Sequence, residues 1–421
     1  MSKRAGAAPG VLLCALLLYA AAPLWSAQSE GASVGTQRER VQAVLQVPGL
    51  AAFWDFVARD QEGRFVAYTS AKWDRAYPLE AVNYVRDYWN EGRPASYADF
   101  PLLNQGPFGQ GVVFRRESDP TFRPTLLLRR EHFHQQALDV NGPGRSVSML
   151  AWLAYQDGDH AVAGIWHEGT DLQFQGQSAS KVEAGKRQYA LFAGLAGNRG
   201  AAAVHVSENG RASFGDRYAR NLAVTPQRIP AASPDADEAA IHAQWSVVGF
   251  VFDNERDRVT AYLNGIAEDY WIEENLFDHP FFKWPANAWK QAQLHRIPGV
   301  QDGEDVNFPP DQFYTPPEDT PIEERLISDS GTIRVRELLY EFTKVRVTER
   351  KKPEGGREPL SRELIALRVN PFWFPHDLFT PESAADGGPF TIGRVIHSGR
   401  NPGIAGMIGG VAVYNRALSA E

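Results

Sequence analysis

The chain of 421 residues carries a formal net charge of −8 and contains a single cysteine, Cys14. This length can bury a large hydrophobic core, and the mildly acidic balance argues against nucleic acid or an anionic membrane as a partner. The sequence has 11 tryptophans, 37 glycines and 28 prolines, so many aromatic rings are combined with many turn-forming residues. That composition favours short strands joined by loops over a helical bundle.

The N-terminal residues have the pattern of a secretory signal peptide. Lys3 and Arg4 precede an unbroken apolar run at residues 11–22. Twelve helical residues span about 18 Å, whereas a membrane helix needs about 20 residues. We therefore predict a cleaved signal peptide at residues 1–27, with an uncleaved N-terminal anchor as the alternative. The predicted location is secreted, periplasmic or in the cell envelope, with no membrane span after cleavage.

Removal of this signal peptide would also remove Cys14, which lies inside the apolar run. The mature protein would then have no disulfide, no zinc–thiolate site and no cysteine nucleophile. Its folded state would depend on the hydrophobic core alone.

Short strand patterns separated by turn residues continue along most of the remaining chain. Val147–Tyr155 is apolar at almost every position, as in a strand covered on both faces. Trp245–Phe252 and Val259–Leu263 flank a polar turn, and the second segment alternates with the period of two typical of a sheet with one face in water. Further strands are predicted at residues 49–56, 111–114, 161–167, 189–195, 201–207, 333–347, 364–369, 390–396 and 407–414.

Residues 266–330 interrupt this rhythm, because they are acidic, rich in proline and crowded with aromatic rings. We predict a long irregular insertion there. The chain shows no extended alternation of helix and strand, which disfavours a parallel α/β sheet. The predicted fold is an all-β antiparallel sandwich. It occupies residues 47–421, after a leader at 28–46 that runs into a short helix at about 38–45.

Several of these segments match one known family. Trp245–Asp253 and Val259–Gly265 resemble the patterns W-x-x-V-A-F-x-Y-D and L-Y-V-N-G of the laminin-G-like, concanavalin A-like jelly-roll family. Residues 406–419 resemble its closing strand, G-x-I-D-E-V-R-I-Y-N-R-A-L-S. Shorter segments similar to family strands are Leu50–Phe56, Val147–Trp152 and Phe390–Arg394.

The resemblance implies a two-sheet antiparallel jelly roll, with one convex and one concave sheet. Members of this family are mostly exported, many bind glycans and some carry calcium, but the fold hosts lectins, adhesion modules, glycosidases and lyases alike. The sequence departs from the family pattern at Gly409 and Gly410, where an Asp-Glu pair is usual. Residues 266–330 have no counterpart in a minimal domain.

Glu337 and Glu341 are the candidate catalytic residues. Laminarinase-like glucanases on this fold use two glutamates four residues apart on one strand, with an aspartate between them. A strand would place Glu337, Leu339 and Glu341 on one face, but Leu339 occupies the position of the aspartate. Glycoside hydrolysis by this carboxylate pair is therefore one hypothesis, and an ordinary solvated strand face is the other.

Candidate metal ligands are carboxylates and histidines near turns. Asp157 and Asp159 offer oxygen ligands suited to Ca²⁺, as does the segment 302–305. Asp and Gly are also the residues that tight turns select. Glu131–His134 would present two histidines on one face if it formed a strand, with no third ligand evident.

The aromatic residues of the insertion are the candidate ligand-binding surface. Flat rings can pack on the apolar faces of sugars while nearby carboxylates accept hydrogen bonds from the hydroxyl groups. The candidate rings are Tyr270, Trp271, Trp284 and Trp289, with Glu273, Glu274 and Asp278 beside them. The alternative is that these rings pack the insertion onto the sandwich.

These observations predict an exported binding module, a lectin-like domain for carbohydrate. Two other hypotheses remain open. One is a glycan-active hydrolase or lyase on the same fold, and the other is a structural or adhesion domain that binds another envelope or extracellular protein.

Overall fold

The computed structural model describes residues 35–419, except 71, 159–160, 170–185, 195–199, 211–221, 234, 238–239, 242–243, 295, 297–312, 398 and 402. The predicted signal peptide, Asp159 and the acidic segment 302–305 lie outside the described residues. Residues Gln37–Glu421 form one compact unit. In the described part of this unit, no helix is long and apolar enough to cross a membrane.

The largest sheet has ten strands, and its centre is built from segments far apart in the chain. β8 (Val147–Asp157) pairs antiparallel with β13 (Ser246–Asp253) on one side and with β22 (Ala405–Tyr414) on the other. The remaining strands are β1 (Leu50–Trp54), β2 (Ala67–Tyr68), β3 (Arg75–Ala76), β5 (Leu102–Gly106), β6 (Gly109–Phe114), β14 (Arg258–Leu263) and β20 (Phe372–Trp373). β22 is buried along its whole length, so the closing strand predicted from the sequence lies inside the sheet and not at its edge.

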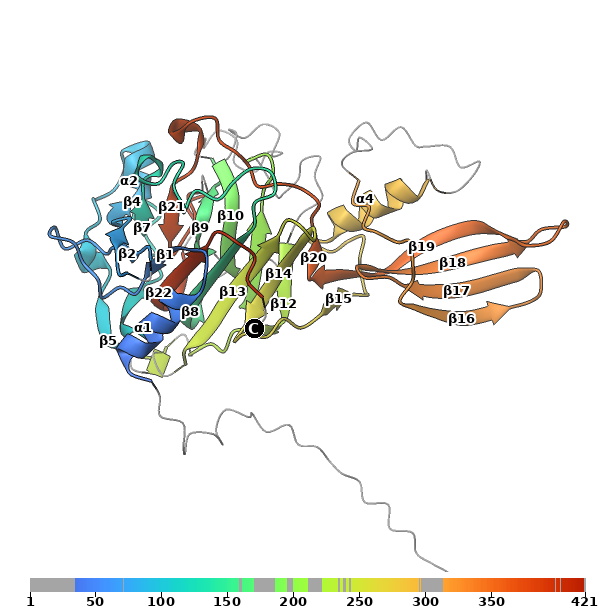
Figure 1. Cartoon of the computed structure of the whole chain (residues 1–421), viewed down its shortest axis with the longest axis horizontal. Coiled ribbons are helices and arrows are strands. Elements are labelled where there is room, and N and C mark those ends of the chain that lie inside the picture. Colours follow the sequence, from blue (N-terminus) through green and yellow to red (C-terminus); the bar gives the residue numbers. More distant parts are fainter. Residues whose placement is uncertain are drawn as a thin grey trace, which may run out of the picture. The chain divides into compact units, whose positions relative to one another are not determined.

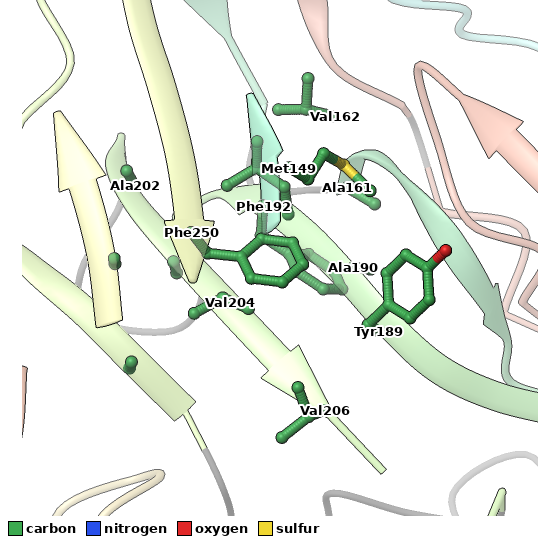
Figure 2. Close-up of a cluster of buried hydrophobic side chains, with 14 of the residues drawn as sticks. Met149, Ala161, Val162, Tyr189, Ala190, Phe192, Ala202, Val204, Val206 and Phe250 are labelled. Carbon is green, nitrogen blue, oxygen red and sulfur yellow. The ribbon is translucent and has the colours of Figure 1, made fainter. Parts of the chain in front are cut away.

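A second sheet of seven strands lies against the first (Figure 1). In spatial order its strands are β12 (Leu222–Arg228), β11 (Ala201–Val206), β10 (Lys186–Ala193), β9 (Ala161–His167), β21 (Phe390–Ile392), β7 (Pro124–Leu128) and β4 (Glu80–Asn83). Between the sheets, Met149 and Phe250 of the larger sheet face Tyr189 and Val204 of the smaller one (Figure 2). The ring centroids of Tyr189 and Phe250 are 6.3 Å apart. This arrangement confirms the predicted all-β antiparallel sandwich.

The register of the seven-stranded sheet shows which of its side chains point away from the core. Tyr189 pairs with Ile165 of β9 and with Val206 of β11, and all three are buried in the core between the sheets. Because successive strand residues alternate between faces, the neighbouring Trp166 and His205 lie on the opposite, outer face.

Helices are short and lie at the ends of strands. α1 (Gln37–Gln46) confirms the short helix predicted at 38–45, and the Tyr414 hydroxyl donates a hydrogen bond of 3.1 Å to its Val44 carbonyl. Among the described residues, further helices of the sandwich include α2 (Tyr84–Trp89) and the 3₁₀ turns η1 (Tyr97–Asp99), η2 (Arg130–His132) and η6 (Ala384–Asp386).

A third sheet extends away from the two stacked sheets (Figure 1). Its order is β15 (Tyr270–Ile272), β19 (Arg357–Asn370), β18 (Thr343–Lys351), β17 (Ile333–Leu339) and β16 (Glu323–Asp329). At its base, the buried Asn370 side chain accepts a hydrogen bond from the Ala261 N–H of β14 at 2.8 Å and donates to the Glu268 carbonyl at 2.8 Å. These bonds connect the five-stranded sheet to the sandwich.

The long irregular insertion predicted at residues 266–330 therefore differs from the structure. That segment contains β15, α4 (Lys283–Leu294) and β16. The strands predicted at 333–347 and 364–369 belong to the five-stranded sheet, not to the stacked pair. Trp271 of β15 pairs with Arg368 of β19, and a partner so distant in sequence leaves no local pattern around a strand of three residues.

Candidate functional site

The structure pairs both candidate catalytic glutamates with arginines. Glu337 lies on β17 between two neighbouring strands, where it accepts hydrogen bonds from Arg325 of β16 at 2.7 Å and from Arg346 of β18 at 2.8 Å. These two arginines hold the pKa of Glu337 below its usual range, although its partial burial opposes the shift. Glu341 lies beyond the end of β17, in the turn before β18, and is ion-paired with Arg258. The two glutamates therefore do not share a strand face.

The four candidate aromatic residues divide between two elements of the five-stranded region. Tyr270 and Trp271 lie on β15, and the Trp271 ring is 5.2 Å from the Lys344 ammonium. Trp284 and Trp289 lie on α4, where Trp289 is only 1% exposed and its indole N–H donates to Glu318 at 2.7 Å. Trp289 thus packs α4 onto the sheet, which is the alternative that the sequence left open.

The candidate metal ligands are also engaged elsewhere or lie outside the described residues. Asp157 is ion-paired with Arg116, and Asp159 is not among the described residues. His134 lies beyond the 3₁₀ turn η2 rather than on a strand, and its Nδ1 is 3.1 Å from Asp139. Across the described ranges, no group of three His, Cys, Asp or Glu residues is placed to hold a metal ion.

The outer face of the seven-stranded sheet instead carries a polar cavity of about 390 Å³. It lies where β7 ends and α2 crosses the sheet. Its lining residues are Asp87, Tyr88, Leu127, Arg129, Arg130, Glu131, Ala384, Gly387 and Pro389. An exposed aromatic ring, two carboxylates and two guanidinium groups therefore converge on one concave surface.

Asn83 positions α2 over this cavity. Its side-chain oxygen caps the helix by accepting from the Val85 N–H at 3.2 Å, and it also accepts from the Arg123 N–H at 2.9 Å. Its amide group donates to the carbonyls of Arg93 at 2.8 Å and Thr121 at 2.9 Å. The cap satisfies an otherwise orphaned helix donor and sets the direction of the helix that carries Asp87 and Tyr88.

Two arginines at the end of β7 form one wall of the cavity. Arg129 donates to Glu80 of β4 at 3.0 Å and to Asp87 of α2 at 3.4 Å. Arg130 is buried and bound to Asp139 and to Gln188. A Cβ at position 387 would come within 2.7 Å of the Arg130 Nε, so a larger residue there would displace this guanidinium group.

His167 lies at the end of β9, beneath Tyr88. The two rings meet edge to face with centroids 5.2 Å apart. Burial lowers the pKa of His167 to about 3, and the positive charges of Lys186 and Arg187 add to that effect. The imidazole is therefore neutral at physiological pH, and its Nδ1 accepts the Gly169 N–H at 3.1 Å.

Glu168, the next residue, is the centre of a buried polar cluster. Its carboxylate accepts from the Trp166 indole at 2.8 Å and lies 2.9 Å from His397 Nε2 and 3.5 Å from Arg187. Burial alone would raise the pKa of Glu168, but Arg187, His397 and Trp166 hold it well below its usual range. His397 Nδ1 accepts from the Gly399 N–H at 2.7 Å, so Nε2 carries the proton donated to Glu168.

An aromatic group continues the outer face beyond Glu168. The ring centroids of Trp166 and His205 are 5.4 Å apart, and Phe192 lies 5.3 Å from His205 and 6.0 Å from Trp166. All three are buried in this structure. Together with the cavity, the Glu168 cluster makes the outer face the part of the sandwich where polar and aromatic side chains concentrate.

The sequence interpretation named Glu131 only as part of a candidate metal segment, and it missed the other residues of this site. Glu168 and His397 are 229 positions apart, and Tyr88 lies on a helix of six residues. One usable signal was present. Trp166, His167 and Glu168 end a strand that is otherwise apolar, and such a polar run in a buried strand requires partners from elsewhere in the fold.

Comparison with known proteins does not add a relative. No protein-family model matches the chain, and no curated protein is similar to it in sequence.

Proposed function

We propose that the outer face of the seven-stranded sheet binds carbohydrate, with the cavity beside Tyr88 as the principal contact. The observation that carries this proposal is the meeting of a Tyr88 side chain that is 42% exposed with Asp87, Arg129 and Glu131 in a cavity of about 390 Å³. Ligand sites are commonly of about 300 to 1,000 Å³ with a few convergent polar groups. A ring can pack on the apolar face of a sugar while charged groups bind its hydroxyls.

We also propose that the sandwich is a jelly roll of the concanavalin A-like type. Its support is the position of the segments that resemble the family. β14, β13, β8, β22 and β1 carry five of these segments and lie side by side in one sheet, while the sixth segment supplies β21 of the other sheet. The same proposal includes export, on the basis of the signal-peptide pattern at residues 1–27. Mass determination of the mature N-terminus tests that part directly.

Binding is tested with the purified mature protein on a glycan array, followed by calorimetry with the strongest ligand. We expect Tyr88→Ala to weaken binding about tenfold, since loss of an aromatic contact of about 1.4 kcal/mol corresponds to that factor. Glu131→Ala should weaken it further. Trp271→Ala is the matched control, because it removes a ring from the five-stranded sheet and should leave affinity unchanged. Loss of binding in Trp271→Ala but not in Tyr88→Ala would move the site to the five-stranded sheet.

A hydrolase or lyase is the alternative that this experiment also addresses. Two arginines pair with Glu337 and lower its pKa, whereas a general acid needs a raised pKa near the working pH. We therefore expect no release of reducing ends from any polysaccharide that binds. Release that persists in Tyr88→Ala and disappears in Glu337→Gln would establish the enzyme instead.

A second candidate function, adhesion to another protein, is favoured by the surface of the five-stranded sheet. Of the eight large apolar side chains exposed in the described part of the chain, four lie on or beside it: Ile322, Leu326, Ile327 and Leu360. Exposed apolar groups gathered in one region often mark protein contacts. Capture of an envelope protein that is lost in Leu326→Asp but retained in Tyr88→Ala would support this function.

A further inference from the structure

At one corner of the seven-stranded sheet β4 and β21 end and β7 begins. Asn83 at the end of β4 pairs with Pro124 of β7, and Leu126 of β7 pairs with Ile392 at the end of β21. Tyr84 and Arg123 adjoin these strand ends, and Arg394 follows Ile392 by two residues. Two of the three are arginines, so positive charge collects at this corner of the sheet.

Arg394 is the unusual member of this group. It is only 2% exposed, and its Nε and Nη1 are buried without a hydrogen-bond partner. Within the described ranges, no carboxylate lies within ion-pair distance of its guanidinium. Burial lowers the pKa of Arg394 to about 10, so the group stays charged at neutral pH. An isolated buried charge is strongly unfavourable unless something neutralises it.

The other two arginines of this corner have hydrogen-bond or ion-pair partners. Arg123 donates to the carbonyls of Arg400 at 2.6 Å, Glu117 at 2.9 Å and Phe122 at 3.2 Å. Arg400 is ion-paired with Glu91 at 2.7 Å. Carbonyl groups and a remote carboxylate therefore satisfy these two cations and leave Arg394 as the unbalanced charge.

Tyr84 provides a second buried group without a partner. Its side chain is fully buried, and its hydroxyl has no hydrogen-bond partner. Burial raises the pKa of Tyr84, and the nearby guanidinium groups of Arg394, Arg123 and Arg400 oppose that rise. The hydroxyl therefore stays protonated and can donate a hydrogen bond to an acceptor such as an anion.

We propose that this corner holds a small monovalent anion of the size of chloride, bound by the Arg394 guanidinium and the Tyr84 hydroxyl. Both groups are donors, and an anion accepts from both while neutralising the buried charge. The depth of Arg394 favours a monatomic ion over a carboxylate or sulfate ester carried by a larger ligand.

Such an anion would stabilise the loop at residues 393–404. The ends of this loop meet through the Ile404 N–H and the Gly393 carbonyl at 3.0 Å. A Cβ at Gly403 would lie 2.9 Å from the Arg394 guanidinium carbon, so the loop closes directly onto that group. The same loop carries His397 to Glu168, which makes the anion a structural support for the outer face and independent of the carbohydrate proposal.

The test is diffraction from crystals of the mature protein in which bromide replaces chloride. We expect an anomalous peak between the Arg394 guanidinium and the Tyr84 hydroxyl. In solution, the thermal midpoint should rise by about 1 to 3 °C on replacing isethionate with chloride at constant ionic strength. Tyr84→Phe preserves the shape of the residue and should remove most of that rise, as should Arg394→Met.

Arg325→Met is the matched control, since Arg325 is an exposed arginine that is ion-paired with Glu337. It should keep both the bromide peak and the full response to chloride. An ordered water at the site in place of bromide, or a chloride response that Tyr84→Phe leaves intact, would overturn the proposal. If Arg394→Met fails to fold, Tyr84→Phe still decides the question.

Discussion

The seven-stranded and five-stranded sheets both bind glutamates through arginines, but they do so at different depths. The Glu168 side chain is 12% exposed and the Arg187 side chain 10%, with Trp166 and His397 completing the set of donors. On the five-stranded sheet, Glu337 lies between Arg325 and Arg346, whose side chains are 67% and 42% exposed. The two carboxylates are similarly exposed, at 12% and 17%, so the difference in access to water lies in their arginine partners.

This difference indicates that the effect of an ion pair on stability depends on how deeply it is buried, and not on how many such pairs a sheet has. A buried carboxylate that loses its charge leaves a buried cation without a partner, which is strongly destabilising. An exposed pair is screened by water and contributes about 0 to 1 kcal/mol. The arginines that pair with Glu337 on the five-stranded sheet are largely hydrated, so we expect these pairs to matter little, whereas the Glu168 pair beneath the outer face of the sandwich should matter a great deal.

The largest expected effect is that of Glu168→Gln. The substitution keeps the shape of the side chain but removes the buried negative charge that faces Arg187 and His397, so we expect a loss of about 3 kcal/mol in the free energy of unfolding. Urea denaturation followed by tryptophan fluorescence measures this loss. A change below about 1 kcal/mol would mean that the cluster is solvated in solution and that the two sheets do not differ as described.

Acidification should destabilise the sandwich through His167. Its pKa is lowered to about 3 in the folded state, against about 6.5 in an unfolded chain. The unfolded state therefore binds the extra proton, and the stabilising effect, complete above pH 6.5, is lost as the pH falls towards 3. Each pH unit in this window corresponds to about 1.4 kcal/mol at most, so the loss between pH 6.5 and 4.5 should be about 2 kcal/mol.

The control for this prediction is His167→Gln, whose amide oxygen can still accept the Gly169 N–H. The variant has no titrating ring and should lose about 2 kcal/mol less than the natural protein over the same pH interval. Parallel pH profiles for the two proteins would show that His167 is hydrated in the folded state.

The elements that the sequence predicts well are those whose partners are close in the chain. The hairpin of β13 and β14 is one example. Phe250 pairs with Ala261 across a polar turn at residues 254–257, and Asp257 at the end of this turn adopts a positive φ. The alternating pattern and the turn residues thus contain the information needed for both strands and their register.

The five-stranded sheet and the outer face lack such local information. β15 has three residues and a partner about a hundred positions away, so its pairing depends on where the sandwich places β19. Glu168, Arg187 and His397 come from three separate segments, and their individual surroundings in the sequence are ordinary. Their common position follows from β9, β10 and β21 being neighbours in one sheet, which the resemblance to a family could imply only in outline.

The smallest expected effect is that of Glu337→Gln, and it provides the closest comparison with Glu168→Gln. The same chemical change is made at a carboxylate that also has two arginine partners. Because both arginines are partly hydrated and Arg346 also lies 3.6 Å from Glu363, neither is left as an isolated buried charge. We expect a loss below about 1 kcal/mol by urea denaturation, reduced further in 1 M salt. A loss as large as that of Glu168→Gln would show that the cross-strand pairs, and not burial beneath the sheet, stabilise the exposed five-stranded sheet.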